Sequence, residues 1–327
     1  MKIGIIGCGL IGYKRAQNIS EGQVKIVADT DEEKASSLGN LLGARHTASW
    51  RKVADADLDL VIVSTPHHLL PEIALEMVNT GKHVLLEKPG ARFPEELTPI
   101  IKAAKENQVL VHVGFNHRYH PALQKAKQLV DAGEIGPLMF IRAHYGHGGR
   151  LGYEKEWRFN PEISGGGELV DQGTHLIDLA RWFLGDFTTI EGWATSYFWN
   201  SKVEDNGFLL LRTEDQKTAF LHASWTEWKN TFSFEIFGKT GKLKIEGLGG
   251  SYGVERLMFY RMLPHMGPPE TIIWEFPASD SSWRNEFLAF LNSIKTKTHL
   301  EPGPEDAQAV LSIVQSIRRK SGYDYCS

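Results

Sequence analysis

A glycine-rich loop near the start of the chain constrains the fold more than any other stretch. The apolar run 2–6 predicts a buried strand, and it is followed by Gly7-Cys8-Gly9-Leu10-Ile11-Gly12 and then by a predicted helix over 13–19. A second strand-like run, residues 24–28, ends on Asp29. Strand, glycine-rich loop, helix, strand and acid within about thirty residues complete the dinucleotide-binding fingerprint. The alternative interpretation is an ordinary turn between a strand and a helix, because glycine-rich turns are common.

The residue types of this loop fit the binding of a pyrophosphate. Gly7 permits a tight turn, Gly9 lets the backbone approach the phosphates, and Gly12 lets the helix pack closely on the strand. The pyrophosphate would lie at the helix N-terminus, at Leu10 and Ile11, where free N–H groups and the helix dipole favour negative charge.

Asp29 indicates which dinucleotide is bound. Its carboxylate would hydrogen-bond the adenosine ribose hydroxyls and would repel a 2′-phosphate, and Thr30 and Asp31 supply no cation to hold one. We therefore expect NAD rather than NADP. Lys34 or Arg45 could weaken this preference by folding back toward the site.

Length and composition limit the class of protein. With 327 residues the chain exceeds one typical domain, and 42% hydrophobic and 23% charged residues are ordinary for a globular protein. The net charge of −4 argues against nucleic acid or an acidic membrane as partner. Glycines interrupt the apolar N-terminus, which excludes a signal peptide, and no apolar run approaches a membrane span. Cys8 and Cys326 form no disulfide or metal pattern, so we expect a cytoplasmic protein.

Alternating strand and helix signals predict an α/β fold for the first part of the chain. Strand-like runs at 59–63, 83–86 and 109–113 alternate with helical patterns at 70–79 and 94–107. This order predicts a doubly wound parallel sheet in an NAD-binding Rossmann domain of residues 1–120. Ligands bind at the carboxyl ends of such strands, where the loops carry these further candidate cofactor contacts: Thr65, Pro66, His67, Glu87, Lys88 and Asn116.

The pattern changes after a predicted helix at 121–132. From residue 137 the chain is rich in strands, and the alternation in 232–236 and 243–245 predicts an antiparallel hairpin with one buried face. Helical patterns return at 282–295 and 304–320. We therefore expect a second, α+β domain over residues 121–327, which would bind the substrate.

Lys88 is the first candidate catalytic residue. It follows a strand directly, between Glu87 and Pro89, where ligands of parallel sheets bind. A surface lysine paired with Glu87 is the ordinary alternative for this residue type. Its location favours a functional role.

The second candidate is a glycine run, 165–167, followed by a helical segment with Asp171 and His175. These two residues are four apart, so they would share one face of the helix. An imidazole oriented by a carboxylate can act as a general base near neutral pH. A partly buried, purely structural histidine is the alternative. No third ligand stands at a useful spacing, so we predict no metal site.

Polar and aromatic residues gather just before the glycine run. Arginine and tryptophan suit sugar or phosphate recognition through forked hydrogen bonds and stacking, although surface or interface roles are equally open. The residues concerned are Tyr145, His147, Arg150, Trp157 and Arg158. Of three histidines around residue 117, we single out His117 because it follows a strand end closely.

Together these motifs resemble the Gfo/Idh/MocA family of glucose–fructose oxidoreductase and inositol dehydrogenase-like enzymes. Glu87-Lys88-Pro89 followed by an Asp-x-x-x-His helix, at Asp171 and His175, is specific to that family. The resemblance also covers the glycine loop, Thr65-Pro66, Gly114-Phe115-Asn116 through Arg118, Trp157-Arg158 and the glycine run.

The resemblance implies a Rossmann domain followed by a domain whose large, mostly antiparallel open sheet commonly forms oligomer contacts. A homodimer or homotetramer is therefore expected, as is a cis peptide bond before Pro89. One departure concerns the residues after Thr65-Pro66, where the family often has Asn and, three residues later, His. Here these are His67 and Leu70, which puts local cofactor contacts in doubt.

The family's activity implies transfer of a hydride between NAD(P) and a secondary hydroxyl of a sugar, sugar nucleotide or polyol. His175 would take the hydroxyl proton, Asp171 would orient it or bind substrate, and Lys88 would hydrogen-bond the reacting oxygen. Which of Lys88 and His175 accepts the proton is left open. The remaining substrate contacts expected are Arg118, Tyr145, Trp157 and Arg158.

The substrate itself is open at this stage. The aromatic and arginine cluster, with a general likeness to enzymes of surface-polysaccharide assembly, favours a sugar nucleotide over inositol or another free polyol. A catalytically silent NAD-binding regulator is an alternative of another class, although Lys88, Asp171 and His175 together argue against it. NAD-dependent glycoside cleavage is a third alternative.

Overall fold

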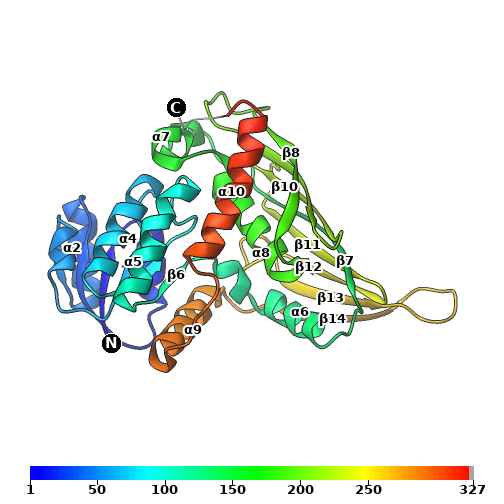
Figure 1. Cartoon of the computed structure of the whole chain (residues 1–327), viewed down its shortest axis with the longest axis horizontal. Helices are drawn as coiled ribbons and strands as arrows, with labels where there is room; N and C mark the ends of the chain where they lie inside the picture. Colours follow the sequence, from blue (N-terminus) through cyan, green and yellow to red (C-terminus); the bar gives the residue numbers. More distant parts are fainter. Residues whose placement is uncertain (324–327) are drawn as a thin grey trace. The chain divides into compact units, whose positions relative to one another are not determined.

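Six parallel strands form the first sheet of the computed structural model, which describes residues 1–323 (Figure 1). Their order is β3-β2-β1-β4-β5-β6, so successive strands are added on one side of β1 up to β3 and on its other side from β4 onward. In a doubly wound sheet, ligands bind at the switch point, which here lies between β1 and β4. The strands are β1 (Lys2–Ile6), β2 (Gln23–Ala28), β3 (Arg45–Thr47), β4 (Leu60–Val63), β5 (His83–Leu86) and β6 (Val111–Val113). The central strands of this sheet are almost wholly apolar because both faces of the sheet are covered.

The helices between these strands agree with the predicted alternation. They are α1 (Leu10–Gln17), α2 (Glu32–Leu42), the short α3 (Arg51–Ala54), α4 (Leu70–Asn79) and α5 (Thr98–Asn107), with 3₁₀ turns η1 (His67–Leu69) and η2 (Pro94–Leu97). The Rossmann sheet predicted from the sequence is confirmed.

Eight strands form the second sheet, in the order β14-β13-β12-β11-β7-β10-β9-β8. Every neighbouring pair is antiparallel except β7 with β10. The predicted hairpin is β11–β12, with Phe234 opposite Ile245. The strands are β7 (Leu138–Gly146), β8 (Phe187–Thr195), β9 (Asn206–Thr213), β10 (Thr218–Ser224), β11 (Thr231–Gly238), β12 (Gly241–Glu246), β13 (Glu255–Arg261) and β14 (Glu270–Phe276).

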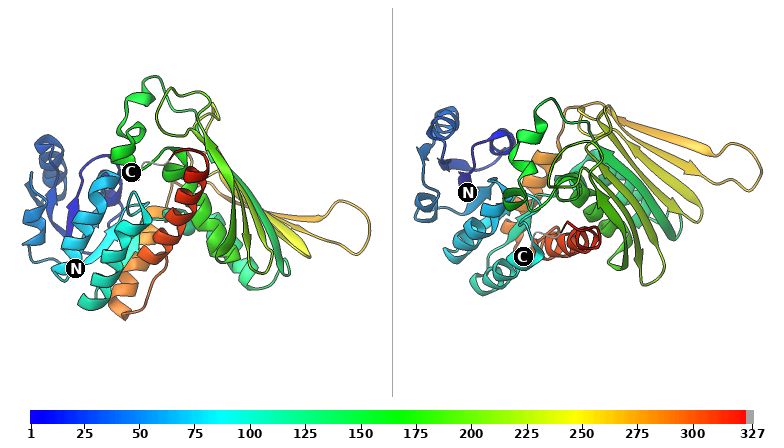
Figure 2. Two further views of the ribbon diagram at one scale, coloured as in Figure 1. Left: turned by 45° about the horizontal axis from the view of Figure 1, so that its top comes forward. Right: turned by 90° about the horizontal axis from the view of Figure 1, so that it is seen from above.

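Helices cover one face of this sheet and leave the other open (Figure 2). Helix α6 (Pro121–Asp131) contacts β12, β13 and β14, and α8 (Thr174–Leu184) contacts β7 and β10. Along β7, Ile141 and Ala143 are buried beneath the helices, whereas Phe140 and Arg142 on the opposite face are exposed. The predicted large, mostly antiparallel open sheet is therefore confirmed.

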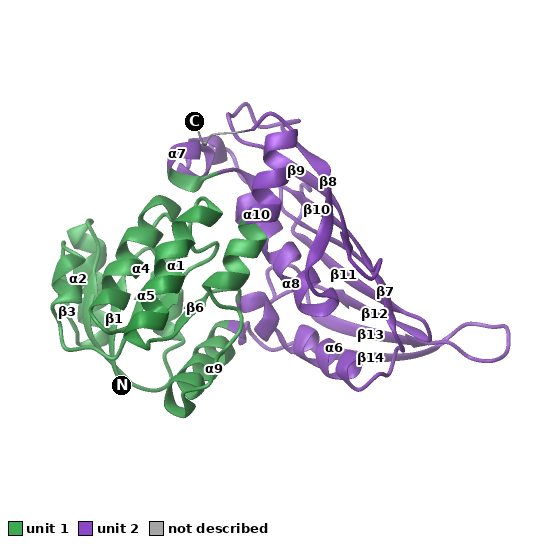
Figure 3. Cartoon of the chain, in the orientation of Figure 1, with its two compact units in different colours: residues 1–115, 163–165, 283–311 green, residues 116–162, 166–282, 312–327 purple. Residues whose placement is uncertain are grey.

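The chain divides into two compact units (Figure 3). Unit 1 comprises residues 1–115, 163–165 and 283–311, and unit 2 comprises 116–162, 166–282 and the described residues from 312 onward. The first division lies close to the expected boundary at 120. The sequence predicts a single domain after residue 120, whereas α9 (Ser282–Thr296) from Trp283 onward and the start of α10 (Pro304–Lys320) cluster with unit 1.

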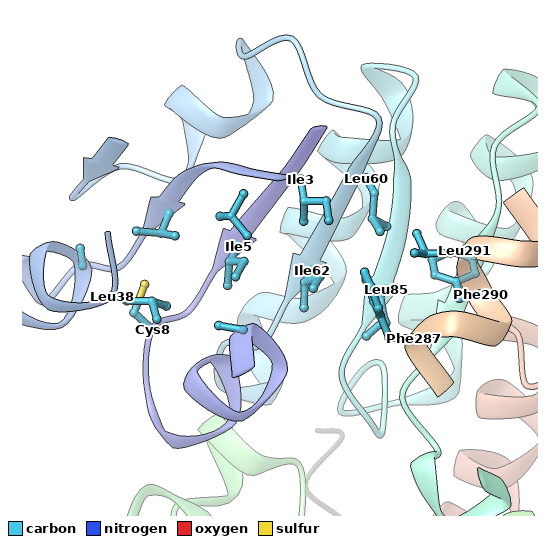
Figure 4. Packing of buried hydrophobic residues seen from close by; sticks show 14 residues of the cluster. Ile3, Ile5, Cys8, Leu38, Leu60, Ile62, Leu85, Phe287, Phe290 and Leu291 are labelled. Carbon is cyan, nitrogen blue, oxygen red and sulfur yellow. The ribbon is translucent and has the colours of Figure 1, made fainter. Parts of the chain in front are cut away.

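The return of α9 has a hydrophobic cause. Phe287, Phe290 and Leu291 are buried in one cluster with Ile62 and Leu85 of the parallel sheet (Figure 4). Sequence periodicity identifies α9 as amphipathic but cannot tell which sheet its apolar face will meet.

Two further findings concern the described residues as a whole. No helix among residues 1–323 is long and apolar enough to cross a membrane, and these residues contain no cluster of side chains suited to a metal ion. Cys8 is buried as a free thiol, while Cys326 lies outside the described residues. The cytoplasmic location stays a prediction.

Candidate active site

The three fingerprint glycines face different surroundings. A Cβ on Gly7, where φ is +92°, would lie 2.5 Å from the Ser64 carbonyl oxygen, and one on Gly12 would lie 1.8 Å from the Gly7 oxygen. A Cβ on Gly9 would meet nothing within 4 Å. Gly7 and Gly12 are therefore required by the packing of the chain itself, whereas Gly9 borders open space.

That open space lies at the N-terminus of α1. The first helical hydrogen bond runs from Tyr13 N–H to the Gly9 carbonyl at 2.9 Å, so the amides of Leu10 and Ile11 have no acceptor within the helix. Leu10 is 75% exposed, and the first turn carries no acidic residue. Free donors, an open approach and the helix dipole together fit a dinucleotide pyrophosphate.

Asp29, which follows β2, is hydrogen-bonded to the glycine-rich loop. Its two carboxylate oxygens accept hydrogen bonds from the Cys8 N–H at 2.7 Å and the Asp31 N–H at 2.9 Å. Burial, with Asp29 adding to it, raises the pKa of the Cys8 thiol to about 12. Lys34 pairs with Asp31 at 2.8 Å, and its charge interacts more weakly with that of Asp29.

The loop after β4 supplies the next predicted cofactor contacts. Thr65 Oγ1 is buried without a hydrogen-bond partner among the described residues, which leaves it available to a ligand near the glycine loop. Pro66 immediately precedes η1, in which His67 is buried and its Nδ1 lies 2.7 Å from the Ser164 carbonyl oxygen. A carbonyl only accepts, so Nδ1 of His67 carries the proton and is already engaged. The departure at His67 thus has a structural role of its own.

The end of β5 is tied into a buried network of charged groups. Arg15 of α1 donates from Nε to Glu87 Oε1 at 2.6 Å and also pairs with Glu286 of α9. His112 of β6 completes the network, with Nε2 3.2 Å from Glu286 Oε1. Burial raises the pKa of Glu87 against the pull of Arg15, whereas at Glu286 the attraction of Arg15 and His112 outweighs burial and lowers the pKa.

This network places Lys88 directly beside a fixed carboxylate. Glu87 was predicted to contact the cofactor, yet its carboxylate is held inside the unit by Arg15. Lys88 itself is half-buried, and the Lys88–Pro89 bond is cis, as predicted. Sequence reasoning missed Arg15 and Glu286, because their partners lie far away along the chain.

Unit 2 carries the remaining candidates, beginning with the 3₁₀ turn η3 (Asn116–Tyr119). Asn116 is buried and its Nδ2 donates to Ser282 Oγ at 2.8 Å. Arg118 makes a two-pronged ion pair with Asp178 of α8, from Nε at 2.8 Å and Nη2 at 2.7 Å. Two donors of Arg118 are therefore engaged within the protein, and its role as a substrate contact stays a prediction.

Asp171 and His175 lie on two kinds of helix. The sequence predicts one regular helix here, but residues Leu169–Gly173 form a π turn that leads into α8. Asp171 lies in the π turn and His175 is the second residue of α8, so their relative direction differs from that of two α-helical residues four apart. Such π turns are frequent at functional sites.

The glycine run before this turn is explained by packing. A Cβ on Gly167 would lie 1.9 Å from the Glu204 carbonyl oxygen, and one on Gly166 would lie 2.8 Å from the Arg318 guanidinium carbon. The close approach predicted for these glycines is thus to the protein's own chain.

Asp171 is brought together with the arginine and tryptophan predicted to hold substrate. Arg158 Nε lies 3.4 Å from Asp171 Oδ2, and the Arg158 guanidinium lies 4.9 Å from the Trp157 ring centre. Both side chains are half-buried, as is Asp171. Arg158 also donates from Nη1 to Glu156 Oε2 at 3.1 Å, so its guanidinium lies between two carboxylates and beside an indole ring.

Tyr145, like Arg118 and His175 among the predicted substrate residues, is buried. Its hydroxyl is hydrogen-bonded with that of Tyr252. Burial raises the pKa of Tyr145 well above its ordinary value, and the interaction with Tyr252 raises it further. Gln172 Nε2 donates to the Tyr252 hydroxyl at 3.0 Å, and burial raises the pKa of Tyr252 to about 12. Sequence reasoning missed Gln172 and Tyr252.

Two other residues of the predicted cluster lie at its edge. Arg150 is exposed and pairs with Glu156. Burial lowers the pKa of His147, although Asp171 opposes this, so His147 is neutral at pH 7.

A parallel dinucleotide-type sheet, an open helix N-terminus beside an acid, and a large open antiparallel sheet define a two-domain NAD-binding oxidoreductase fold. Residues 1–115 match the profile of the oxidoreductase family with an NAD-binding Rossmann fold, and residues 123–244 match the GFO/IDH/MocA C-terminal domain. The chain therefore belongs to the Gfo/Idh/MocA family.

Two curated relatives bear on function. A levoglucosan dehydrogenase of Pseudarthrobacter phenanthrenivorans is 30% identical over 230 residues, which is 65% of this chain and 58% of the relative. Inositol 2-dehydrogenase 2 of Saccharopolyspora erythraea is 31% identical over 225 residues, covering 66% and 64% of the two chains. The matches thus span less than two thirds of these relatives.

The fold extends over the whole described chain. A solved levoglucosan dehydrogenase in complex with NADH and levoglucosan superposes with a TM-score of 0.87 and covers 98% of each chain at 24% identity. At that identity the likeness concerns the fold.

Proposed function

We propose that this protein is an NAD-dependent dehydrogenase that oxidises a secondary hydroxyl of a sugar or sugar nucleotide. The observation that carries the proposal is the grouping of Trp157, Arg158 and Asp171 at the π turn that leads to His175. An indole face, a forked donor and a carboxylate suit the stacked and hydrogen-bonded recognition of a hydroxylated ring. The names of relatives, dehydrogenases of levoglucosan and inositol, support the same substrate class.

The proposed preference for NAD rests on Asp29. Its carboxylate is fixed against the glycine loop and Lys34 is paired with Asp31, so a 2′-phosphate would meet two carboxylates and a single lysine. When bound, NAD supplies the acceptor for the hydride.

The residues of the chain have separate roles in this proposal. His175 would take the proton of the substrate hydroxyl, and Asp171 with Arg158 would hold neighbouring hydroxyls. Lys88 would donate a hydrogen bond to the reacting oxygen and stabilise negative charge that develops there. The buried Arg15–Glu87 pair next to Lys88 limits the movement of its backbone.

The test is to follow NADH absorbance while purified protein meets NAD and a panel of sugars, nucleotide sugars, sugar phosphates, uronates and inositols. Lys88→Ala serves as the control. Turnover with one ring hydroxyl compound, lost in the variant, would support the proposal. Silence across the panel with intact NADH binding would instead favour a catalytically silent regulator, and release of a cleaved glycoside would indicate the elimination chemistry.

The panel also separates the two substrate groups. Activity with inositols and none with nucleotide sugars would favour the polyol alternative, which the name of the inositol dehydrogenase relative supports. Activity restricted to nucleotide sugars would favour the first.

The division of labour between Lys88 and His175 is tested by pH profiles of kcat. Loss of the proton acceptor should remove the acidic limb of the profile. His175→Asn and Lys88→Met are compared with the unmodified protein, and an unchanged profile in both would contradict either assignment.

We also propose that the open face of the eight-stranded sheet is an interface between copies of this chain. Trp193, Leu210 and Phe220 are 58%, 50% and 47% exposed on neighbouring strands of that face. Exposed apolar side chains in a continuous patch indicate a protein interface. Leu210→Lys should lower the mass measured by sedimentation, while Lys239→Glu, in the β11–β12 turn, should not.

A further inference from the structure

His117 lies flat against the proposed proton acceptor. The ring centres of His117 and His175 are 3.7 Å apart and their planes differ by 17°, so the imidazoles are stacked. Both side chains are more than nine-tenths buried. His117 comes from η3 and His175 from α8, which makes this contact a tertiary one.

The other neighbours of His117 are mostly neutral rings. Tyr145 of β7 and Phe232 of β11 lie 5.3 and 6.2 Å away between ring centres. His120 lies 5.5 Å away, and its Nδ1 is held by Glu255 at 2.9 Å. The charged groups beside this cluster are the carboxylates of Glu255 and Asp280, which lie 2.9 and 3.9 Å from the two ring nitrogens of His120.

A chain of hydrogen bonds with a fixed direction ends on His117. Asp280, as a carboxylate, only accepts, so the Ser282 hydroxyl donates to its Oδ1 at 2.6 Å. The Ser282 oxygen then accepts from Asn116 Nδ2 at 2.8 Å. That orients the amide so that Asn116 Oδ1 faces His117 Nδ1 at 3.3 Å, and an amide oxygen can only accept.

We propose that His117 is a positioning residue for His175, and that Asp280, acting through Ser282 and Asn116, holds His117 in its Nδ1–H form. The inference rests on the proposed function in so far as His175 is the proton acceptor. It concerns the order of the His175 ring and does not make His117 a participant in proton transfer.

The physical reason is the requirement for a fixed base. A proton acceptor must be held within hydrogen-bonding geometry of the substrate hydroxyl, and a stacked ring restricts rotation of His175 about its side-chain bonds.

The first test reads the tautomer of His117 and needs neither substrate nor cofactor. Nitrogen-15 spectra of histidine-labelled protein distinguish Nδ1–H from Nε2–H imidazole. Among the 13 histidines, the His117 signal is identified by its loss in His117→Phe. We expect it to show Nδ1–H, and to lose this form in Ser282→Ala and in Asp280→Ala.

Two variants at different links keep the test valid if one of them fails to fold. The matched control is Ser224→Ala. Ser224 is a buried serine of the same unit, and its hydroxyl is hydrogen-bonded with that of Thr226, which is not part of the hydrogen-bond series that leads to His117. The Nε2–H form of His117 in the unmodified protein, or an Nδ1–H form that survives both chain variants, would overturn the proposed lock.

The second test reads the positioning role through kinetics with whichever substrate the panel identifies. His117→Ala should lower kcat at least about tenfold with little change in KM, because a misplaced base affects the reaction step. His117→Phe keeps a stacked ring and should retain kcat within about threefold. Equal losses in both variants, or a loss confined to KM, would contradict positioning by stacking. NADH affinity should be unchanged throughout, and if no substrate turns over, the tautomer test still decides the lock.

Discussion

At the scale of single residues, the Asp29 carboxylate determines the charge that the adenosine ribose of a bound dinucleotide would meet. Its oxygens are fixed by the Cys8 and Asp31 amides, so the side chain is ordered in the protein without ligand. Ordered acceptors cost little further entropy when a ligand binds. The preference for NAD should therefore respond sharply to this residue.

Asp29→Ala should weaken NADH binding by about 1.5–3 kcal/mol, the range for hydrogen bonds to a charged group, which is roughly ten- to a hundredfold in Kd. NADPH binding should weaken less or improve, since the repulsion is removed. Fluorescence titration with both dinucleotides measures the ratio. Glu33→Ala, an exposed acid of α2, is the control for net charge. An unchanged ratio in Asp29→Ala would refute the role of Asp29.

The β1–α1 connection shows, at the scale of an element, how packing and binding are separated within one loop. Gly12 fills a position where the Gly7 carbonyl excludes any side chain, whereas Gly9 faces space in which no protein atom lies within 4 Å. The same substitution at the two positions should therefore have opposite consequences.

Gly12→Ala should destabilise the protein by about 3 kcal/mol or more, because the clash is with backbone and α1 must move. The Gly9→Ala variant should have a melting temperature within a few degrees of that of the unmodified protein. Its affinity for NADH should nevertheless fall at least about tenfold, because the added methyl group occupies space that the pyrophosphate needs. Thermal unfolding and NADH titration give both quantities. Full NADH affinity in Gly9→Ala would place the pyrophosphate elsewhere.

The buried network of Arg15, Glu87, Glu286 and His112 connects α1, β6 and α9 of unit 1 with the residue that follows β5. The pKa of Glu286 is lower in the folded protein than in the unfolded chain. Its ionised form therefore stabilises the fold above the unfolded pKa of about 4.3, and this contribution is lost as pH falls through the folded value.

Glu286→Gln should lower the free energy of unfolding at pH 7 by about 3 kcal/mol, since it leaves Arg15 buried with one carboxylate fewer. The difference in free energy of unfolding between the variant and the unmodified protein should become smaller as the pH is lowered below about 4. Urea unfolding at several pH values measures it, with the exposed Glu305→Gln as control. A difference that stays constant down to pH 3 would show that ionised Glu286 is not the source.

At the scale of the whole molecule, the Rossmann unit is completed by a segment from the end of the chain. Phe287, Phe290 and Leu291 of α9 are each at most 2% exposed in its core, and the Pro302 carbonyl accepts from Val113 at the edge strand β6. Burial of three such side chains is worth about 5–9 kcal/mol, which is comparable with the entire stability of a domain.

A fragment of residues 1–120 should therefore fail to fold stably, although it contains the complete fingerprint. The same fragment joined through a flexible linker to residues 283–311 should fold and bind NADH. Circular dichroism melts and NADH fluorescence distinguish the two. Cooperative melting and NADH binding by residues 1–120 alone would show that α9 is dispensable.

Much of the fold could be predicted from the sequence because it depends on local patterns. The parallel sheet follows from β-branched runs separated by helical periodicity, and the β11–β12 hairpin follows from alternation around the Gly238–Gly241 turn. The π turn at Leu169–Gly173 could not be predicted, because a five-residue segment is too short to show a periodicity of its own.

The sequence by itself determined the dinucleotide fingerprint, the lysine after β5 and the four-residue spacing of Asp171 and His175, since these depend on residue types at short spacing. Only the tertiary structure decided that Arg15 holds Glu87, that α9 completes the Rossmann core and that His117 stacks on His175. Each of these contacts joins residues more than fifty positions apart. Such contacts depend on how packed elements bring distant side chains together, and no local pattern records that.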